Sequence, residues 1–205
     1  MKRVLWLDVD GVLLDYTRAF LEFSKRSIKY EEMTTYDLTV LFDSKEECFE
    51  QMKAFASSYA FANLPVHTDA FYLHALKNAG YDLRIITQLT APAQARKNRI
   101  ANLTNVYGGI FSEIVFTQHG QCKLDYLERR WRHDNSVNYD NPYILVEDNP
   151  VLLGKAENQY HAERSLIQVY GITHPYNTLS TSYMTGVRLF PSFVGVYHDL
   201  LDRIV

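Results

Sequence analysis

Two aspartates separated by one residue, Asp8 and Asp10, follow an apolar stretch near the start of the chain. The residues from Val4 to Leu7 are bulky and uncharged, which is typical of a strand buried on both faces of a parallel sheet. Open α/β sheets bind their ligands at the carboxyl ends of such strands. Gly11 then allows a sharp turn. The spacing therefore predicts two carboxylates at the ligand-binding edge of a sheet.

Further polar groups lie at or after the ends of three later apolar stretches. They are Thr87, Lys123, and the adjacent pair Glu147 and Asp148. If the strands are parallel, their carboxyl ends meet at one edge of the sheet, and these side chains converge with the first two aspartates. This convergence is the strongest functional signal in the sequence.

Carboxylates brought so close together repel one another. Two unit charges about 4 Å apart cost on the order of 4 kcal/mol at an effective dielectric constant of 20, and a bound cation removes this cost. Oxygen ligands without His or Cys favour a hard ion, and Mg²⁺ is usual where a phosphate is also held. Thr87 can donate a hydrogen bond to a phosphoryl oxygen, and Lys123 can neutralise its charge. The set therefore predicts a Mg²⁺-dependent phosphate site.

The elements that would position these groups alternate between strand and helix, which is typical of an α/β layered fold. The expected strands span residues 4–7, 83–87, 114–117, 143–146 and 166–169. The expected helices span residues 16–30, 44–58, 68–78, 92–103, 123–131 and 193–204. Gly80 suits a left-handed cap after the helix over 68–78. Residues 178–190 are polar and show no clear pattern.

The distance between the first two expected strands indicates an insertion. From Asp8 to Thr87 the chain advances by 79 residues (87 − 8), whereas a strand-helix-strand unit needs only about 30. We expect residues 16–66 to form a small, mostly helical cap over the carboxyl edge of the sheet. Residues 1–15 and 67–205 would then form a Rossmann-like core, a three-layer α/β fold with a parallel sheet.

Composition and net charge limit the kinds of molecule that the chain is expected to bind. The chain has 205 residues, a formal net charge of -3 and no long basic run, so a nucleic-acid polymer is not expected as a partner. No leader and no apolar stretch of about 18 residues is present, which argues against secretion and membrane insertion. Cys48 and Cys122 are isolated in sequence, as expected for a reduced cytoplasmic protein. The sequence leaves open whether the chain forms a homodimer.

The polar groups occur in a familiar order: Asp8-Val9-Asp10-Gly11-Val12-Leu13, Thr87 after two apolar residues, Lys123, and Glu147-Asp148 after an apolar residue. This series resembles the four motifs of the haloacid dehalogenase superfamily, in particular its phosphatase branch. Weaker landmarks resemble the 5'(3')-deoxyribonucleotidase-like family. These are residues 34–38, 61–65, 80–81 and 174–177. That family often has two aspartates where this chain has Glu147 and Asp148.

The resemblance implies a role for each acidic residue. Asp8 would attack phosphorus and become an aspartyl phosphate, while Asp10 would protonate the leaving oxygen and then activate water. The Asp8 carboxylate, the Asp10 main-chain carbonyl and Asp148 would hold Mg²⁺, with Glu147 nearby or bound through water. The dehalogenases of the superfamily lack the second aspartate, so Asp10 favours phosphoryl chemistry.

The same resemblance implies how a substrate would be held. Its phosphate would be bound by Thr87, Gln88 and Lys123, and a base could stack on aromatic residues in or beside the cap. The candidates for that base pocket are Tyr16, Tyr36 and Phe61. The expected substrate is a small phosphorylated molecule, with a nucleoside monophosphate favoured.

Several alternatives are also compatible with the sequence. The substrate could be a sugar phosphate or another small metabolite, or the chain could be a non-catalytic phosphoryl-binding or interaction module. Gln121 and Lys155 compete with Lys123 for its position in the site. Glu147 and Asp148 could instead cap the start of a helix.

Overall fold

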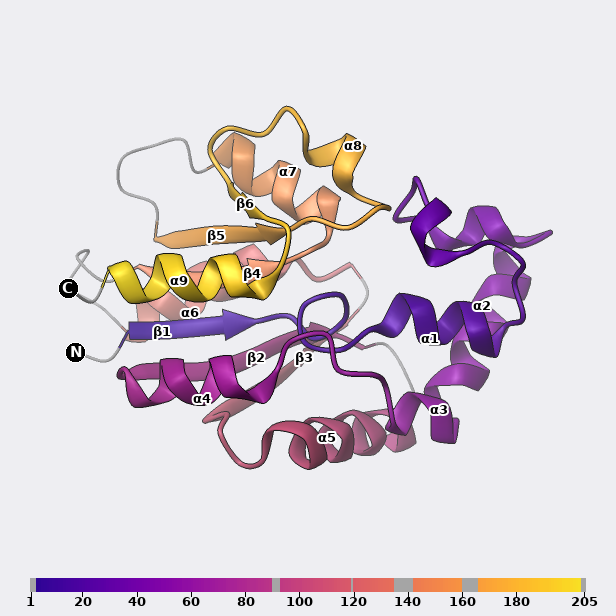
Figure 1. The fold of residues 1–205 in the computed structure, drawn as a ribbon, viewed down its shortest axis with the longest axis horizontal. Helices are drawn as coiled ribbons and strands as arrows, with labels where there is room; N and C mark the ends of the chain where they lie inside the picture. The colour runs from indigo at the N-terminus through magenta and orange to yellow at the C-terminus, as the bar shows by residue number, and fades with distance from the viewer. Residues whose placement is uncertain (1–2, 90–92, 119, 135–141, 160–165, 204–205) are drawn as a thin grey trace.

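The computed structural model describes residues 3–89, 93–118, 120–134, 142–159 and 166–203. Within these residues, six parallel strands form one sheet in the order β3-β2-β1-β4-β5-β6 (Figure 1). The strands are β1 (Arg3–Leu7), β2 (Tyr81–Gln88), β3 (Glu113–Thr117), β4 (Tyr143–Glu147), β5 (Ile167–Ile172) and β6 (Arg188–Phe190). The predicted α/β fold with a parallel sheet is thus confirmed. Strand β1 lies between β2 and β4, so the chain reverses its winding direction where those three carboxyl ends meet.

Alternation along the strands builds a core on each face of the sheet. Leu5 and Leu7 belong to one buried cluster, whereas Trp6 between them belongs to the other. The first cluster includes side chains of α4 (Ala70–Asn78), α5 (Ala93–Tyr107) and α9 (Phe193–Asp202). The second includes side chains of α6 (Lys123–Asp134) and α7 (Pro150–Gln159). The sheet is therefore the middle of three layers.

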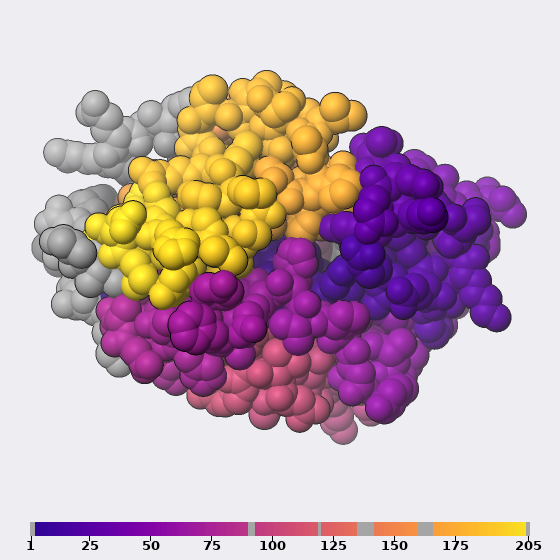
Figure 2. All heavy atoms as spheres, viewed as in Figure 1, coloured from indigo at the N-terminus to yellow at the C-terminus, as the bar shows by residue number. Residues whose placement is uncertain are grey.

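Residues 16–66, which we call the cap segment, lie beyond the carboxyl ends of the strands, opposite the two termini (Figure 1). The segment contains α1 (Tyr16–Phe23), η1 (Tyr30–Glu32), η2 (Leu38–Leu41), α2 (Lys45–Ala56) and α3 (Tyr59–Ala62). Its interior is aromatic: the Phe55 ring centre lies 5.5 Å from that of Phe20 and 5.6 Å from that of Phe61. Figure 2 shows this segment, in indigo and purple, seated against the orange segment that follows β5.

The two chain segments that join the cap segment to the core run side by side. The Asp15 amide donates to the Pro65 carbonyl at 2.9 Å, and the His67 amide donates to the Leu13 carbonyl at 2.9 Å. The Tyr107 hydroxyl of α5 also donates to the Leu13 carbonyl, at 2.7 Å. The crossing between core and cap segment is therefore held by main-chain hydrogen bonds and by a side-chain hydrogen bond from α5.

The helix expected over residues 16–30 ends at Phe23, so this prediction was too long. The chain turns through Lys25, whose φ is +55°. The Arg26 amide donates to the Leu21 carbonyl and the Lys25 amide to the Glu22 carbonyl, which is the Schellman arrangement of a helix end. Continued apolar spacing hid this stop, because a lysine rather than a glycine occupies the left-handed position.

Residues 178–190, for which the sequence shows no clear pattern, contain regular structure that was not predicted. This stretch contains the single turn α8 (Thr178–Thr181) and the edge strand β6. Both are too short to produce a periodic pattern. Helix α7 was also missed as an element, and the Asn149 side chain caps it by accepting from the Val151 amide at 3.0 Å.

Other boundaries lie close to the prediction. Helix α5 continues four residues past the expected end, to Tyr107, whereas the expected start at Pro92 and the expected C-terminal end at Ile204 lie outside the described residues. Gly80 has a φ of +96° and ends α4 as predicted. Cys48 and Cys122 are both free thiols. Among the described helices, none combines the length and apolar character needed to cross a membrane.

Candidate active site

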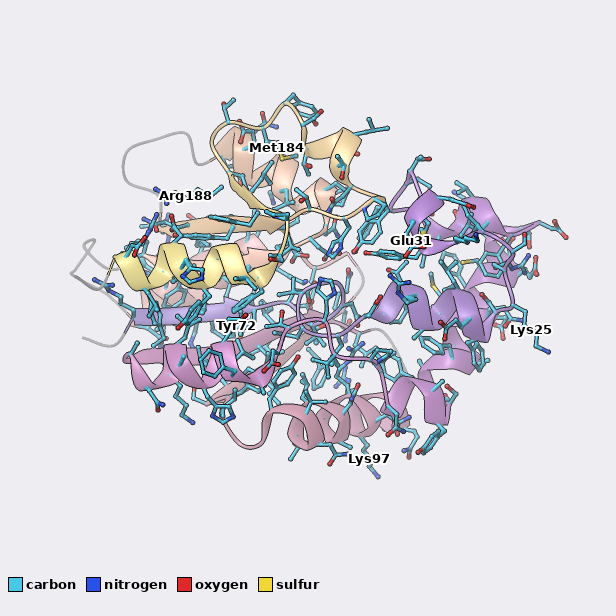
Figure 3. All side chains as sticks on the ribbon, in the orientation of Figure 1. Lys25, Glu31, Tyr72, Lys97, Met184 and Arg188 are labelled. Atoms are coloured by element: carbon cyan, nitrogen blue, oxygen red, sulfur yellow. The ribbon has the colours of Figure 1, made fainter. Side chains whose placement is uncertain are left out.

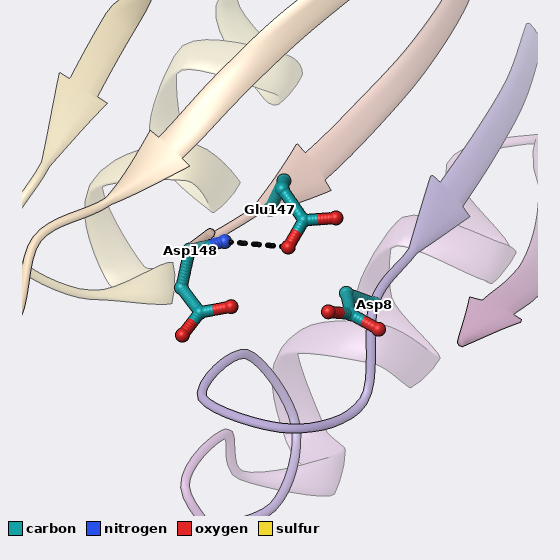
Figure 4. Close-up of side chains that lie close together, drawn as sticks. All are labelled: Asp8, Glu147 and Asp148. Carbon is teal, nitrogen blue, oxygen red and sulfur yellow. Dashed lines mark hydrogen bonds between the residues drawn. The ribbon is translucent and has the colours of Figure 1, made fainter. Parts of the chain in front are cut away.

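Three carboxylates converge at the carboxyl edge of the sheet. Asp8 follows β1, while Glu147 ends β4 and Asp148 follows it; each offers an oxygen that lies within 4.8 Å of the other two (Figure 4). The Asp8 amide donates to the Val146 carbonyl at 3.0 Å, which extends the contact between the two strands. All three carboxylates are buried. The parallel sheet therefore brings together acidic residues that are about 140 positions apart in sequence.

Lys123 lies at this cluster. Its Nζ atom is 2.7 Å from Asp8 Oδ2 and 2.8 Å from Glu147 Oε2, and its side chain is buried. Burial favours the neutral amine, but the carboxylates of Asp8 and Glu147 outweigh it and raise the pKa of Lys123 above its ordinary value. The ammonium group therefore stays charged. Lys155, an alternative from the sequence, instead pairs with Asp125 at 2.7 Å.

One lysine does not neutralise three buried carboxylates. Burial, with the nearby Asp8 carboxylate as the next cause, raises the pKa of Glu147 to about 7. Burial and the neighbouring Glu147 also raise the pKa of Asp148 well above its ordinary value. Such shifts are expected where carboxylates share a water-poor site without enough positive charge. The cluster can therefore accept a further cation.

Individual oxygen atoms indicate where a cation fits. Asp8 Oδ1 and Asp148 Oδ1 are buried and have no hydrogen-bond partner among the described residues. Glu147 differs, because Oε2 accepts from Lys123 while Oε1 accepts from the amides of Asp148 at 3.2 Å and Asn149 at 3.1 Å. Unpartnered buried carboxylate oxygens are costly unless an ion binds them. Donor chemistry and geometry thus fit a hard divalent cation.

Asp10 does not belong to this group of three carboxylates and pairs with Arg99 of α5. Arg99 Nη2 lies 2.6 Å from Asp10 Oδ1 and donates to Asp10 Oδ2 at 2.9 Å. The Arg99 side chain is only 1% exposed, whereas that of Asp10 is 29% exposed. Burial raises the pKa of Asp10, and Arg99 opposes this rise. The two aspartates of the first turn therefore have different electrostatic surroundings.

Sequence reasoning missed Arg99. It falls on the buried stripe of α5, together with Ala95, Asn102 and Leu103. An arginine at helical spacing among residues expected to face the core is the signal that could have identified it. Its guanidinium carbon also lies 4.5 Å from the centre of the Phe61 ring, so the arginine contacts the cap segment as well as the site.

The segment after β5 supports Asp148 from the other side. The Tyr176 hydroxyl donates to Asp148 Oδ2 at 2.6 Å, and Asn177 Nδ2 donates to the Asp148 carbonyl at 2.7 Å. Gly11 packs closely here: its φ is +74°, and an added Cβ would overlap the Asp148 carboxylate. Residue type alone did not mark Tyr176 or Asn177 as site residues, although residues 174–177 formed part of the family resemblance.

His174 links this segment to the first turn and to the cap segment. Its Nε2 atom lies 2.7 Å from the Gly11 carbonyl oxygen, and its Nδ1 atom lies 2.8 Å from the Tyr30 hydroxyl. A carbonyl only accepts, so Nε2 carries the proton and Nδ1 accepts from Tyr30. Burial, and next the neighbouring His67, lower the pKa of His174 to about 4. The imidazole is therefore neutral near pH 7.

Thr87 and Gln88, the other predicted phosphate ligands, end β2. Thr87 is buried and lies two residues beyond Ile85, which is in register with Leu7 of β1. It thus reaches the same sheet edge as Asp8. Gln88 is exposed, and its Nε2 atom donates to the Gln118 carbonyl at 3.2 Å. The side chain of Gln88 is therefore engaged with the segment after β3.

The three aromatic residues expected near a base differ in their surroundings. Tyr16 packs among cap rings, with its centre 5.4 Å from that of Phe55. Phe61 is only 1% exposed and lies between these rings and Arg99. Tyr36 is 41% exposed, and its ring centre lies 5.8 Å from that of Tyr176 beside the site. Of the three, Tyr36 offers the most surface to a substrate.

Comparison with known proteins supports the fold. No model of a protein family matches the sequence, and no curated protein matches it significantly. Among solved structures, a haloacid dehalogenase-like family hydrolase from Streptococcus pneumoniae is similar over 97% of this chain and 98% of its own, with a TM-score of 0.63 and 16% identity.

Two further solved structures are similar to this chain over 98% of its residues and 99% of their own. One is YfnB from Bacillus subtilis, described as a HAD-hydrolase bound to magnesium, with a TM-score of 0.57 and 13% identity. The other is the L-2-haloacid dehalogenase from Xanthobacter autotrophicus, with a TM-score of 0.55 and 14% identity. The chain thus has the haloacid dehalogenase-like fold that its motifs predicted. Because hydrolases of carbon–halogen bonds share this fold, the fold does not identify the substrate.

Proposed function

We propose that the chain is a Mg²⁺-dependent phosphomonoester hydrolase in which Asp8 is the nucleophile and Asp10 the general acid and base. The observation that carries the proposal is that the two aspartates of the first turn, Asp8 and Asp10, have different partners. Asp8 lies with Lys123, Glu147 and Asp148, whereas Asp10 pairs separately with Arg99 and stays partly exposed. A nucleophile and a proton donor need such different surroundings. Simple dehalogenation has no use for the second carboxylate.

The residues that would hold the ion follow from their free oxygens. Asp8 Oδ1 and Asp148 Oδ1 supply carboxylate ligands, and the family resemblance adds the Asp10 main-chain carbonyl. Both oxygens of Glu147 are engaged, so Glu147 orients Lys123 rather than binding the ion directly. When bound, Mg²⁺ supplies positive charge to the phosphoryl group and to Asp8. The magnesium in the structure of YfnB is consistent with this choice of ion.

The reaction proceeds in two displacements. Asp8 attacks phosphorus, the bond from phosphorus to the ester oxygen breaks, and Asp10 gives its proton to that oxygen. Asp10 then takes a proton from water as the water oxygen attacks phosphorus, which releases inorganic phosphate and restores the Asp8 carboxylate. Lys123 and Thr87 hold the phosphoryl oxygens during both steps.

The substrate that we favour is a nucleoside monophosphate, with its base on the exposed Tyr36 ring. Exposure of Tyr36 beside Tyr176 and the resemblance to 5'(3')-deoxyribonucleotidases support this choice. A sugar phosphate or another small phosphomonoester is the second candidate. The enclosure of Phe61 favours it, because that ring has no open face for stacking a base.

The test is phosphate release from a panel of substrates with Mg²⁺ and with excess chelator. The panel holds ribo- and deoxyribonucleoside 5'- and 3'-monophosphates, sugar phosphates and p-nitrophenyl phosphate, and halide release from 2-haloacids is measured in parallel. Asp8→Asn should abolish turnover, whereas Asp202→Asn, at an exposed aspartate in the last turn of α9, should not. Halide release without phosphate release would contradict the proposal. Binding of phosphate without any turnover would indicate a non-catalytic module.

A further inference from the structure

The two carboxylate oxygens of Asp148 differ in their contacts, because Tyr176 donates to only one of them. Its hydroxyl donates to Oδ2 at 2.6 Å, while Oδ1 remains without a hydrogen-bond partner among the described residues. Asn177 fixes the main chain of the same aspartate through its carbonyl. A hydrogen bond to one oxygen restrains rotation of the carboxylate and leaves the other oxygen directed to a cation.

The Tyr176 ring is enclosed by residues from both parts of the chain. Its centre lies 4.9 Å from the stacked His174 ring, 5.9 Å from Tyr30 and 5.8 Å from Tyr36. We call these four residues the ring cluster. Tyr30 and Tyr36 belong to the cap segment, whereas His174 and Tyr176 follow β5 in the core. The support for Asp148 is therefore assembled from both sides of the site.

The cap side of the ring cluster is itself anchored. The Arg18 guanidinium lies 4.6 Å from the Tyr30 ring centre and pairs with Glu31 at 3.0 Å and Asp15 at 3.1 Å. In Figure 3, Glu31 lies at the border between the cap segment and the core, whereas Lys25 lies at the outer end of the cap segment. Helix η1 is thus one part of the cap segment that meets the segment after β5, together with Tyr36.

We propose that Tyr176 is a positioning residue for Asp148, and that the ring cluster couples cation binding to the contact between η1 and the core. The inference rests on the proposed cation site and adds the device that orients one of its ligands. Coupling of this kind is reciprocal: a cap segment that holds Tyr176 in place strengthens cation binding, and a bound cation strengthens the contact of the cap segment.

The first test measures metal binding without substrate, by titrating the full chain with Mn²⁺ and following free Mn²⁺ by electron paramagnetic resonance. Tyr176→Phe keeps the ring and removes the hydroxyl, and it should weaken binding roughly 10- to 100-fold. Tyr170→Phe is the matched control, because it also removes a buried tyrosine hydroxyl that donates to an aspartate, here Asp199 at 2.8 Å. That control should bind Mn²⁺ as the unaltered chain does.

The second test addresses the cap segment. Tyr30→Phe removes the hydrogen bond to neutral His174 and should weaken Mn²⁺ binding roughly 2- to 10-fold. Hydrogen exchange at the amides of Glu32 and Met33 reports on η1, since both donate within that turn. Mg²⁺ should slow this exchange in the unaltered chain and have no effect on it in Tyr176→Phe.

The outcomes separate the two proposals. Unaltered Mn²⁺ affinity in Tyr176→Phe, together with loss of binding in Asp148→Asn, would overturn the positioning role and leave the cation site standing. Mn²⁺ binding that Asp148→Asn leaves unchanged would overturn both. An equal effect of Mg²⁺ on η1 exchange in the unaltered chain and in Tyr176→Phe would overturn the coupling.

Discussion

Asp10 and Arg99 form an ion pair, with 2.6 Å between Asp10 Oδ1 and Arg99 Nη2, across the junction of the first turn and α5. The pair gives Asp10 a cationic partner other than Lys123, which pairs with Asp8 and Glu147. Arg99 therefore holds Asp10, the proposed proton donor. The same arginine also contacts Phe61 of the cap segment. The side chain of the proposed proton donor is thereby held by a residue that does not contact the three carboxylates proposed to surround the ion.

This separation predicts the behaviour of Arg99→Met. Loss of the arginine should lower the free energy of unfolding by about 2 kcal/mol, below the usual cost of breaking a buried pair because Asp10 is partly exposed. We expect kcat to fall at least tenfold while Mn²⁺ affinity stays unchanged. Arg99→Lys should restore only part of the activity, since an ammonium cannot reproduce the planar contact with Phe61. A parallel loss of Mn²⁺ binding would show that the two parts of the site are not separate.

Gly11 offers a test of close packing with a control in the same chain. Gly11 and Gly80 both have positive φ, but an added Cβ overlaps the Asp148 carboxylate only at Gly11 and has no neighbour within 4 Å at Gly80. Each alanine substitution should cost about 1 to 2 kcal/mol of backbone strain. Only Gly11→Ala should also lose Mn²⁺ binding and turnover. Chemical unfolding and Mn²⁺ titration of both variants would measure the two effects.

Because the buried carboxylates repel one another, we expect that removing one of them increases the stability of the chain. Without Mg²⁺, Asp148→Asn removes an ionisable carboxyl group from a buried cluster that one lysine does not neutralise, and it should stabilise the chain by about 1 kcal/mol. For a chain of this length, that corresponds to a melting temperature higher by about 2 to 4 °C. Added Mg²⁺ should raise the melting temperature of the unaltered chain and leave that of Asp148→Asn unchanged. A lower melting point for the variant without Mg²⁺ would argue against repulsion.

His174 predicts a loss of stability in acid. Its pKa of about 4 lies below the ordinary value of 6.5, so the unfolded chain takes up a proton there before the folded chain does. Stability from this group is therefore complete above pH 6.5 and falls as the pH drops toward 4, by about 3 kcal/mol in total. His174→Gln should remove this part of the pH dependence, whereas His74→Gln, at an exposed histidine of α4, should leave it intact. Urea unfolding between pH 4 and pH 7.5 would measure it.

The sequence by itself determined the parallel sheet and the group of charged residues at its carboxyl edge. Apolar runs that end in polar residues specify parallel strands, and the carboxyl ends of neighbouring strands must meet, so the approach of Asp8, Lys123, Glu147 and Asp148 followed from their order alone. The first helix was drawn too long, because its stop depends on a left-handed lysine that no periodic pattern reveals.

Only the tertiary structure decided which side chains pair with Asp10 and Asp148. Arg99 is 89 positions from Asp10, and Tyr176 is 28 positions from Asp148. Their types are compatible with many surroundings, and only the packing of α5 and of the segment after β5 gives them these partners. The proposed division of roles between Glu147 and Asp148 likewise depends on the fold. The fold decides which of their carboxylate oxygens accept from main-chain amides, Lys123 or Tyr176, and that Asp148 Oδ1 has no partner among the described residues.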